Sequence, residues 1–316
     1  MAGATRPGNV ALLSGGVGGA KLALGLYTVM DPARLTVVAN SGDDIDIFGL
    51  RVCPDADILA YTLADQVGPL GWGIGGDTFR ALERVRLLGG TGWFNLGDVD
   101  IGLHLFRAEL MQQGVPLGEI TRRMAAALGL KCTLLPMCEQ KVTTRIHTDK
   151  GTLHLQEYLV RDRAEPVVRG IAFEGVEASR PVPGVLDALH AAQLIVIAPS
   201  NPLISIGPIL AVPGLRDALR QAKGHRVAVT PLVGGASLKG PTDKMLAQLG
   251  KAVSPVTVAE DYRDVIDTFV LDAQDAHLTP QIQALGMHCV SLPTVMSDLA
   301  AKQSLARHLL ALVGGG

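Results

Sequence analysis

The sequence has little net charge, few cysteines and no long hydrophobic run. A formal net charge of −2 over 316 residues gives no electrostatic reason to expect nucleic acid or an anionic membrane as a partner. The apolar runs are strand-length and broken by Gly, Pro or charge, so we expect no transmembrane helix. No secretory signal is apparent. The four cysteines, Cys53, Cys132, Cys138 and Cys289, lack the paired spacing of a metal site and are typical of reduced thiols in a cytoplasmic protein.

Apolar residues and glycine are abundant, at 48% and 37 residues, whereas aromatic residues make up only 4%. This composition favours an α/β protein with a Rossmann-like, mostly parallel sheet and helices on both faces. Buried strands are predicted at residues 10–13, 35–39, 194–198, 226–230, 268–271 and 287–292. No repeat or low-complexity linker divides the chain, so residues 1–316 are predicted to form a single domain.

Residues 131–176 have a different pattern. Segments 143–148, 151–156 and 157–160 alternate with period two, and Asp149-Lys150-Gly151 is typical of a hairpin turn. The alternation predicts a small antiparallel β insertion within the parallel fold.

A glycine-rich turn follows the first predicted strand, with the sequence Ser14-Gly15-Gly16-Val17-Gly18-Gly19-Ala20-Lys21 and then a helix to about Met30. Strand, glycine turn and helix together favour phosphate binding, because backbone N–H groups and the helix dipole attract an anion. Ala20 and Leu22 break a Walker A motif, and Lys21 breaks the dinucleotide fingerprint. We therefore predict an anion site from Gly15 to Lys21; a turn used for packing alone is the alternative.

Two acidic clusters follow. Asp43, Asp44 and Asp46 come after the strand 35–39, where ligands bind in open α/β sheets. They have the chemistry to ligate Mg²⁺, or they simply solvate a turn. Asp55 and Asp57 precede a helix predicted from Ile58 to about Gln66, where Asp55 is a candidate N-cap.

Other candidate residues are less specific. Trp72, Phe79, Trp93 and Phe94 are either a stacking surface for a flat ring or ordinary core aromatics. His104, on an apolar helical face, is predicted to be a core histidine. The loops after residues 198 and 230 bring small polar groups to strand ends, and Lys244 is either a phosphate ligand or a solvated side chain.

The order of motifs resembles one family over nearly the whole chain. The first half carries Gly15-Gly16-x-Gly18-x-Ala20-Lys21-Leu22, Asn40-Ser41-Gly42-Asp43-Asp44, Pro54-Asp55-x-Asp57 and Gly76-Asp77-Thr78-Phe79. The rest carries Leu96-Gly97-Asp98-x-Asp100 with His104, Pro199-Ser200-Asn201-Pro202-x-x-Ser205-Ile206-Gly207-Pro208, and Gly240-Pro241. No single motif is decisive, but the ordered set resembles the CofD family, the 2-phospho-L-lactate transferases of deazaflavin coenzyme F-420 biosynthesis.

The resemblance implies a Mg²⁺-dependent transferase. A phospholactyl-type group (phospholactate, phosphoenolpyruvate or phosphoglycerate) would pass from a guanosine diphosphate donor to 7,8-didemethyl-8-hydroxy-5-deazariboflavin, with GMP leaving. Asp44 and Asp55 match acidic family positions and are predicted to be catalytic and to ligate the metal. The other predicted substrate-binding residues are Gly15, Gly16, Gly18, Lys21, Trp72, Asp77, Asn95, Asp98, Ser200, Asn201 and Gly207. We also expect a homodimer.

Two departures from the family pattern bear on the pocket. Asn95 stands where many relatives carry a basic residue that touches the deazaflavin, and Val99 stands where Arg is usual. The expected alternative to an enzyme is a non-enzymatic, nucleotide-sugar-binding regulator of the same superfamily. An NAD-dependent dehydrogenase is disfavoured by the missing glycine pattern at Lys21.

Overall fold

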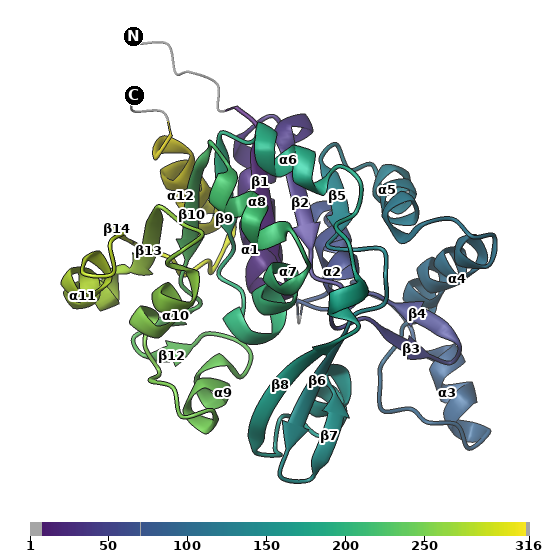
Figure 1. Ribbon diagram of the computed structural model, residues 1–316. Helices are drawn as coiled ribbons and strands as arrows, with labels where there is room; N and C mark the ends of the chain where they lie inside the picture. Colours follow the sequence, from purple (N-terminus) through teal and green to yellow (C-terminus); the bar gives the residue numbers. More distant parts are fainter. Residues whose placement is uncertain (1–7, 70, 314–316) are drawn as a thin grey trace.

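The computed structural model describes residues 8–69 and 71–313. Seven parallel strands form its central sheet, in the order β14-β13-β10-β9-β1-β2-β5 (Figure 1). Their bounds are Val10–Ser14 (β1), Leu35–Ala39 (β2), Thr133–Pro136 (β5), Leu194–Ile197 (β9), His225–Val229 (β10), Thr268–Asp272 (β13) and His288–Leu292 (β14). The predicted α/β class and parallel sheet are confirmed.

The strand order reverses at β1. The next strand in sequence, β2, pairs with one edge of β1, and β9 pairs with the other, so that Val10 lies beside both Leu35 and Leu194. Chain connections leave β1 and β9 in opposite directions at such a point, which opens a crevice at the carboxyl ends of the strands. The glycine turn and the loop after β9 therefore meet at one edge of the sheet.

Helices cover both faces of the sheet, as Figure 1 shows. Neighbouring residues of β1 explain why: Leu12 packs into one buried apolar cluster and Leu13 into the other, because successive side chains of a strand point to opposite faces. One face is covered by α1 (Gly16–Val29), α2 (Pro54–Leu63), α5 (Leu117–Ala127) and α12 (Leu299–Ala311). The other is covered by α6 (Val185–Ala191), α7 (Gly207–Ala211), α8 (Leu215–Gln221), α10 (Pro255–Tyr262) and α11 (Thr279–Gln283).

Smaller elements surround the strand ends. They are the hairpins β3 (Ile45–Ile47) with β4 (Leu50–Val52) and β11 (Leu232–Val233) with β12 (Ala236–Ser237), and the helices α3 (Arg80–Leu87), α4 (Asp98–Gln112) and α9 (Thr242–Gln248). Among the described residues, no single helix has the length and apolar character required to cross a membrane. One pair bent by 84°, Pro202–Ala211 with Leu215–Gln221, meets those criteria by length and composition only.

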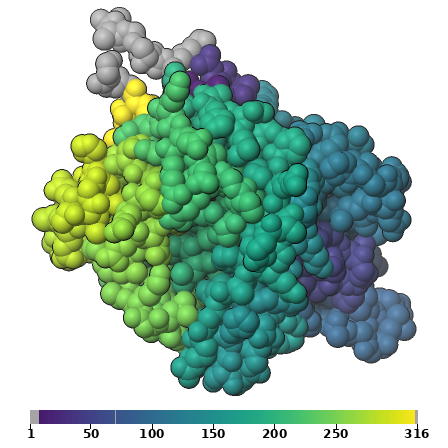
Figure 2. All heavy atoms as spheres, in the orientation of Figure 1, coloured from purple at the N-terminus to yellow at the C-terminus, as the bar shows by residue number. Residues whose placement is uncertain are grey.

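The antiparallel insertion is confirmed, but its limits differ from the prediction. It consists of β6 (Thr143–Thr148), β7 (Gly151–His154) and β8 (Val168–Glu174), and it projects from the body of the molecule (Figure 2). Residues 133–136 instead form the edge strand β5, parallel to β2. The segment predicted as a strand at 157–160 is a helical turn, Glu157–Arg161, which packs Tyr158 into the small core of the insertion. The turn at 157–160 was mistaken for a strand because periodicity cannot tell strand from helix in so short a segment.

Helix α2 begins earlier than predicted. It starts at Pro54 with Cys53 as its N-cap, so Asp55 lies inside the first turn and is not the cap. The Asp57 carboxylate accepts the N–H of Cys53 at 3.2 Å, which satisfies one donor at the helix start. Because Asp57 bonds to the helix start, the Asp55 carboxylate can instead accept the N–H of Gly16 in the glycine turn.

Helices α1 and α12 pack closely at Gly25. A Cβ at this position would overlap the carbonyl oxygen of Lys302 and lie 2.8 Å from its carbonyl carbon. We predict that Gly25→Ala lowers the free energy of unfolding by about 1–3 kcal/mol, because backbone atoms of α12 must move. Urea denaturation measures the change.

The matched control is Gly102→Ala, at a helical glycine of α4 with nothing within 4 Å of the added carbon. Alanine there should raise stability by about 0.5–1 kcal/mol. Equal effects of the two substitutions would contradict the packing argument.

Candidate active site

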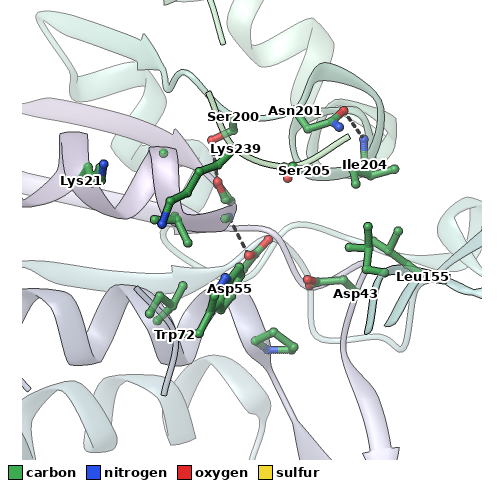
Figure 3. A pocket seen from close by; sticks show the side chains of 18 of the residues that line it. Lys21, Asp43, Asp55, Trp72, Leu155, Ser200, Asn201, Ile204, Ser205 and Lys239 are labelled. Atoms are coloured by element: carbon green, nitrogen blue, oxygen red, sulfur yellow. Dashed lines mark hydrogen bonds between the residues drawn. The ribbon is translucent and has the colours of Figure 1, made fainter. Parts of the chain in front are cut away.

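A cavity of about 620 Å³ opens at the carboxyl ends of β1 and β9. Its walls come from the glycine turn, the start of α2, the loop after β9, the end of β7 and residues 230–242. Figure 3 shows the labelled side chains of these segments converging on one space. Most of the predicted site residues lie here: Gly15, Gly16, Gly18, Lys21, Asp55, Trp72, Asn95, Ser200 and Asn201.

The glycine turn is bonded to two neighbouring segments. The N–H of Gly15 donates to Ser200 Oγ at 3.3 Å, and the N–H of Gly16 donates to Asp55 Oδ1 at 2.6 Å. A Cβ at Gly18 would lie 2.5 Å from the carbonyl oxygen of Pro199. Gly15 and Gly18 thus serve close packing, whereas Gly16 adopts a positive φ of 64°. Phosphate binding by the segment from Gly15 to Lys21 stays a prediction, with the N–H groups of Gly15 and Gly16 already bonded within the protein.

Two buried carboxylates, Asp43 and Asp55, share one amide on the cavity wall. Asn40 Nδ2 donates to Asp55 Oδ2 at 2.9 Å and to Asp43 Oδ1 at 3.4 Å. Gln156, from the insertion, donates from Nε2 to Asp43 Oδ2 at 3.1 Å. The second oxygen of each carboxylate is therefore also engaged, by Gln156 for Asp43 and by Gly16 for Asp55.

Burial shifts the titration of both groups. It raises the pKa of Asp55 to about 6, against the hydrogen bonds from Asn40 and Gly16 that favour the anion. It raises the pKa of Asp43 well above the usual range, with a further contribution from the negative charge of Asp55. Two carboxylates destabilised by burial and by each other are a fitting place for a divalent cation. The described residues contain no cluster of three or more His, Cys, Asp or Glu side chains arranged for a metal, so these two would need ligands from substrate or water.

Asp44 faces away from this pair. Its Oδ2 accepts from Arg51 (Nε at 3.2 Å, Nη2 at 3.1 Å) and from Cys53 Sγ at 3.1 Å, and it is not among the residues that line the cavity. Burial raises the pKa of Asp44 despite the neighbouring guanidinium of Arg51. The geometry thus joins Asp55 with Asp43 at the cavity. Oδ1 of Asp44 is buried without a hydrogen-bond partner among the described residues, and the predicted pairing of Asp44 with Asp55 at a metal stays a prediction. Adjacent residues in a turn point to different sides, which the sequence could not resolve.

A buried polar network lies behind the acidic wall, which is the part of the cavity lined by Asp43 and Asp55. Arg107 is bonded to Asp57, and its Nη1 donates to the carbonyl oxygen of Arg51 at 2.8 Å. His104 is fully buried, as predicted, with Nε2 3.5 Å from Asp100 Oδ1, and Asp100 also accepts from the Tyr61 hydroxyl. These groups hold α2 against α4 and fix the floor of the cavity. The prediction that His104 is a core residue is confirmed, and His104 also lines the cavity.

Two of the predicted site residues, Trp72 and Asn95, belong to the segment between α2 and α4. Trp72 is 48% exposed and lines the cavity, and Asn95 lines it with Oδ1 accepting from Arg86 Nη2 at 3.0 Å. Trp93 instead packs edge-to-face on Phe94 in a small apolar cluster. The stacking interpretation therefore stays a prediction for Trp72, and the core interpretation applies to Trp93.

Asp77 and Asp98 lie outside the cavity lining. Asp77 accepts the N–H groups of Val99 at 2.9 Å and Asp100 at 3.1 Å, at the start of α4. Asp98 accepts from Thr78 Oγ1 at 2.5 Å and from the N–H of Ala81 at 2.9 Å. The two carboxylates bind the loop to the starts of α3 and α4, so the geometry assigns them a structural role in place of the predicted substrate contact.

Of the three site residues predicted in the loop after β9, two line the cavity and one does not. Ser200 and Asn201 line the cavity, and Asn201 Oδ1 accepts the N–H of Leu203 at 2.8 Å at the start of the turn Pro202–Ile206. Gly207 lies at the start of α7, away from this cavity, where a Cβ would approach Pro202 O at 3.0 Å and Phe173 Cζ at 3.1 Å. Its predicted substrate contact is not supported by this position; the residue is a packing glycine.

Lys21, in the second turn of α1, also lines the cavity. Its Nζ donates to the carbonyl oxygen of Met296 at 3.0 Å. Burial, then the charges of Lys239 and Lys302, lowers the pKa of Lys21. Lys244 lies outside the cavity lining and donates to the carbonyl oxygen of Ala164, which favours the solvated interpretation. Gln156 and Lys239 also line the cavity but were not predicted from the sequence, because neither belongs to a glycine-rich or acidic motif.

Comparisons with known proteins agree on one family. A family model described as 2-phospho-L-lactate transferase CofD matches residues 10–303. A phosphoenolpyruvate transferase of Streptomyces griseus is 38% identical over 310 residues, covering 96% of this chain and 98% of the relative. A 2-phospho-L-lactate transferase of Methanosarcina mazei is 37% identical over 296 residues, covering 93% and 97%. A crystal structure of a UPF0052 family member from Bacillus halodurans has the same fold, with a TM-score of 0.63 at 16% identity, covering 97% of this chain and 99% of that one.

The buried carboxylate of Asp43 predicts an unusual pH dependence of stability. Because the folded-state pKa lies above the unfolded one, the wild-type protein loses stability as the pH rises through that pKa, whereas an amide loses none. We predict that Asp43→Asn stabilises the metal-free protein at about pH 7.5 and that the gain shrinks toward about pH 4. Urea denaturation in the presence of a chelator measures it.

Asp46→Asn is the control, because Asp46 is half-exposed and paired with Lys141. It should change stability by less than about 1 kcal/mol throughout the range. A stability gain for Asp43→Asn that is absent, or equal at every pH, contradicts the interpretation of Asp43 as a destabilised buried anion.

Proposed function

This chain belongs to the CofD family and is a transferase, and we propose that it moves a phospholactyl-type group from a guanosine diphosphate donor to 7,8-didemethyl-8-hydroxy-5-deazariboflavin. GMP leaves, and the product enters coenzyme F-420 biosynthesis. The three-carbon acid is phospholactate, phosphoenolpyruvate or phosphoglycerate; relatives named for phosphoenolpyruvate and for phospholactate match this chain at 38% and 37% identity.

The observation that carries the proposal is that two carboxylates and a lysine line one cavity. Asp43, Asp55 and Lys21 line the same cavity, and Asp55 accepts the N–H of Gly16 at the start of α1, the helix that carries Lys21. Transfer of a phosphoryl group requires positioning and neutralisation of charge more than covalent chemistry. A diphosphate placed between a cation held by the acidic wall and the ammonium group of Lys21 meets both requirements.

Mg²⁺ is the cation we propose for the acidic wall, held by Asp43 and Asp55. When bound, it supplies charge neutralisation to the phosphate oxygens. Asn40 and Gln156 orient the two carboxylates by donating to them. Asp55 also accepts the N–H of Gly16. This bond holds the proposed metal ligand at a fixed position relative to the glycine turn.

Trp72, Phe94 and Asn95 form the proposed acceptor side of the cavity. The indole of Trp72 is exposed enough to stack on a flat deazaflavin ring. Asn95 presents a neutral amide where many relatives have a basic residue, so it can bond to ring oxygens but adds no charge. The acceptor hydroxyl must reach the phosphorus from this side.

The partners in this proposal are small molecules, with no nucleic acid and no membrane. A homodimer and a cytoplasmic location stay predictions. The alternative function is a non-enzymatic regulator that binds a nucleotide sugar. The resemblance to the Bacillus halodurans protein, at 16% identity, shows the fold alone and does not favour it. The carboxylate pair beside an exposed tryptophan favours the transferase.

The metal assignment is tested by comparing neighbouring aspartates. We predict that Asp43→Asn and Asp55→Asn each lower Mg²⁺-dependent GMP release by about 10²-fold or more, because each removes a charge from the metal wall. Asp44→Asn should retain far more activity, since its carboxylate faces Arg51 outside the cavity. GMP release is followed by chromatography, and Mg²⁺-induced thermal stabilisation provides a second measure.

If Asp44→Asn abolishes both readouts while Asp43→Asn keeps them, the metal lies on the other side of the turn. Circular dichroism of each variant shows whether the fold is intact. Full turnover in the Asp43 and Asp55 variants would remove both residues from the mechanism.

Acceptor binding is tested with the two tryptophans. We predict that the deazaflavin quenches the fluorescence of the wild-type protein and that Trp72→Phe removes most of the quenching. Trp93→Phe should keep it, because Trp93 is not among the residues that line the cavity and packs against the edge of Phe94 instead. Binding of a nucleotide sugar with no quenching by the deazaflavin would support the regulator instead.

A further inference from the structure

Lys239 lines the same cavity as Lys21 but belongs to the other half of the chain. It follows the β11–β12 hairpin, whose turn residues Gly234 and Gly235 have φ angles of +60° and +76°. Ser237 Oγ and Asp243 Oδ1 lie 3.1 Å apart, and the N–H of Asp243 donates to Ser237 Oγ at 3.0 Å. These bonds close a short loop over residues 238–242 and place Lys239 at the edge of the cavity.

The side chain of Lys239 extends into the cavity toward the residues that the first half of the chain contributes, as Figure 3 shows. Its Nζ is 3.5 Å from the position that a Cβ of Gly71 would occupy, and Val17 Cγ1 is 3.2 Å from the same position. The ammonium group therefore lies beside the start of α1 and next to the loop that carries Trp72. Gly71 has a φ of +79° and leaves room for this approach.

The two lysines create a positive wall that favours an anion. The charge of Lys239 is the second cause, after burial, that lowers the pKa of Lys21, and Lys302 is the third. Within residues 8–69 and 71–313, the structure shows Lys21 bonded to a neutral carbonyl and records no carboxylate within 4 Å of its Nζ. Like charges held together in a partly buried cavity gain most from a multivalent anion.

We propose that Lys239 is a second phosphate-binding cation of the donor site and that, with Lys21, it clamps the diphosphate of the nucleoside diphosphate-linked donor. This inference rests on the proposed function, because it concerns the donor of that reaction. Lys239 comes from the segment after β10, and Lys21 from α1, so the donor would hold the two halves of the cavity together.

The role of Lys239 in the transfer follows from where charge develops. The acceptor hydroxyl oxygen forms a new bond to the distal phosphorus, and its proton leaves to solvent. The bond from that phosphorus to the bridging oxygen breaks, and its electron pair stays on the bridging oxygen of the departing nucleoside monophosphate. An ammonium group beside that oxygen stabilises the added charge.

The test uses GDP and GMP as probes of the full-length protein with Mg²⁺. Lys239→Ala should weaken GDP binding by about tenfold or more and GMP binding by less than about threefold, because GDP carries the extra phosphate that two lysines hold. Lys239→Arg should restore GDP binding to within about threefold, since the charge is kept. Turnover of Lys239→Ala should fall by more than its loss of GDP affinity, because charge stabilisation is also lost.

Lys244→Ala is the matched control: it is an exposed lysine five residues along, bonded to the insertion and not to the cavity. It should bind GDP as the wild type does. Lys239→Ala with wild-type GDP binding, or with equal losses for GDP and GMP, overturns the clamp. If the wild-type protein itself neither binds GDP nor releases GMP, the proposed function fails, so the two failures are distinguishable.

Discussion

The site depends on the burial of one carboxylate, that of Asp55. It lies in the first turn of α2, accepts the N–H of Gly16 and is bonded to the amide of Asn40. Three segments that are separate in sequence are therefore held at fixed positions by one side chain: the glycine turn, the acidic loop and α2. Burial of this anion is unfavourable, as its pKa of about 6 indicates, and the hydrogen bonds from Asn40 and from the N–H of Gly16 at the start of α1 favour the anion. A residue that organises the turn is thus also the residue best placed to hold a metal.

The parallel sheet explains why opposite charges line one small cavity. Carboxyl ends of β1, β2, β9 and β10 lie along one edge, so each loop delivers its polar residues to the same space. The first half of the chain contributes the carboxylates and Lys21, whereas the second contributes Ser200, Asn201 and Lys239. The insertion adds Gln156, which donates to Asp43, so it helps to orient the acidic wall as well as to enlarge the fold. Because Lys239 and the carboxylates come from different halves of the chain, a shift between the halves would change the distance between them.

Several features were predictable because they depend on local pattern. Apolar runs identified the central strands, and the ordered motifs identified the family, which the comparisons confirm. The positions of Gly15, Gly16, Gly18, Ser200 and Asn201 at one edge followed from parallel strand order. Asp77, Asp98 and Gly207 belong to equally recognisable motifs, yet Asp77 and Asp98 cap helices and Gly207 packs against Phe173. A motif shows that a residue type is needed, but substrate contact and structural support produce the same motif.

The sequence by itself determined the fold class, the family and the presence of an acidic loop after β2. Only the tertiary structure decided which aspartate of Asp43 and Asp44 faces the cavity, because side-chain direction in a turn depends on the partners around it: Asn40 and Gln156 for one, Arg51 and Cys53 for the other. It also decided that β5 belongs to the main sheet, since pairing with β2 is a contact between distant residues. Lys239 is the third case. It has no motif of its own, and its nearness to Lys21 exists only because the strand order brings the end of β10 to the same edge as the glycine turn.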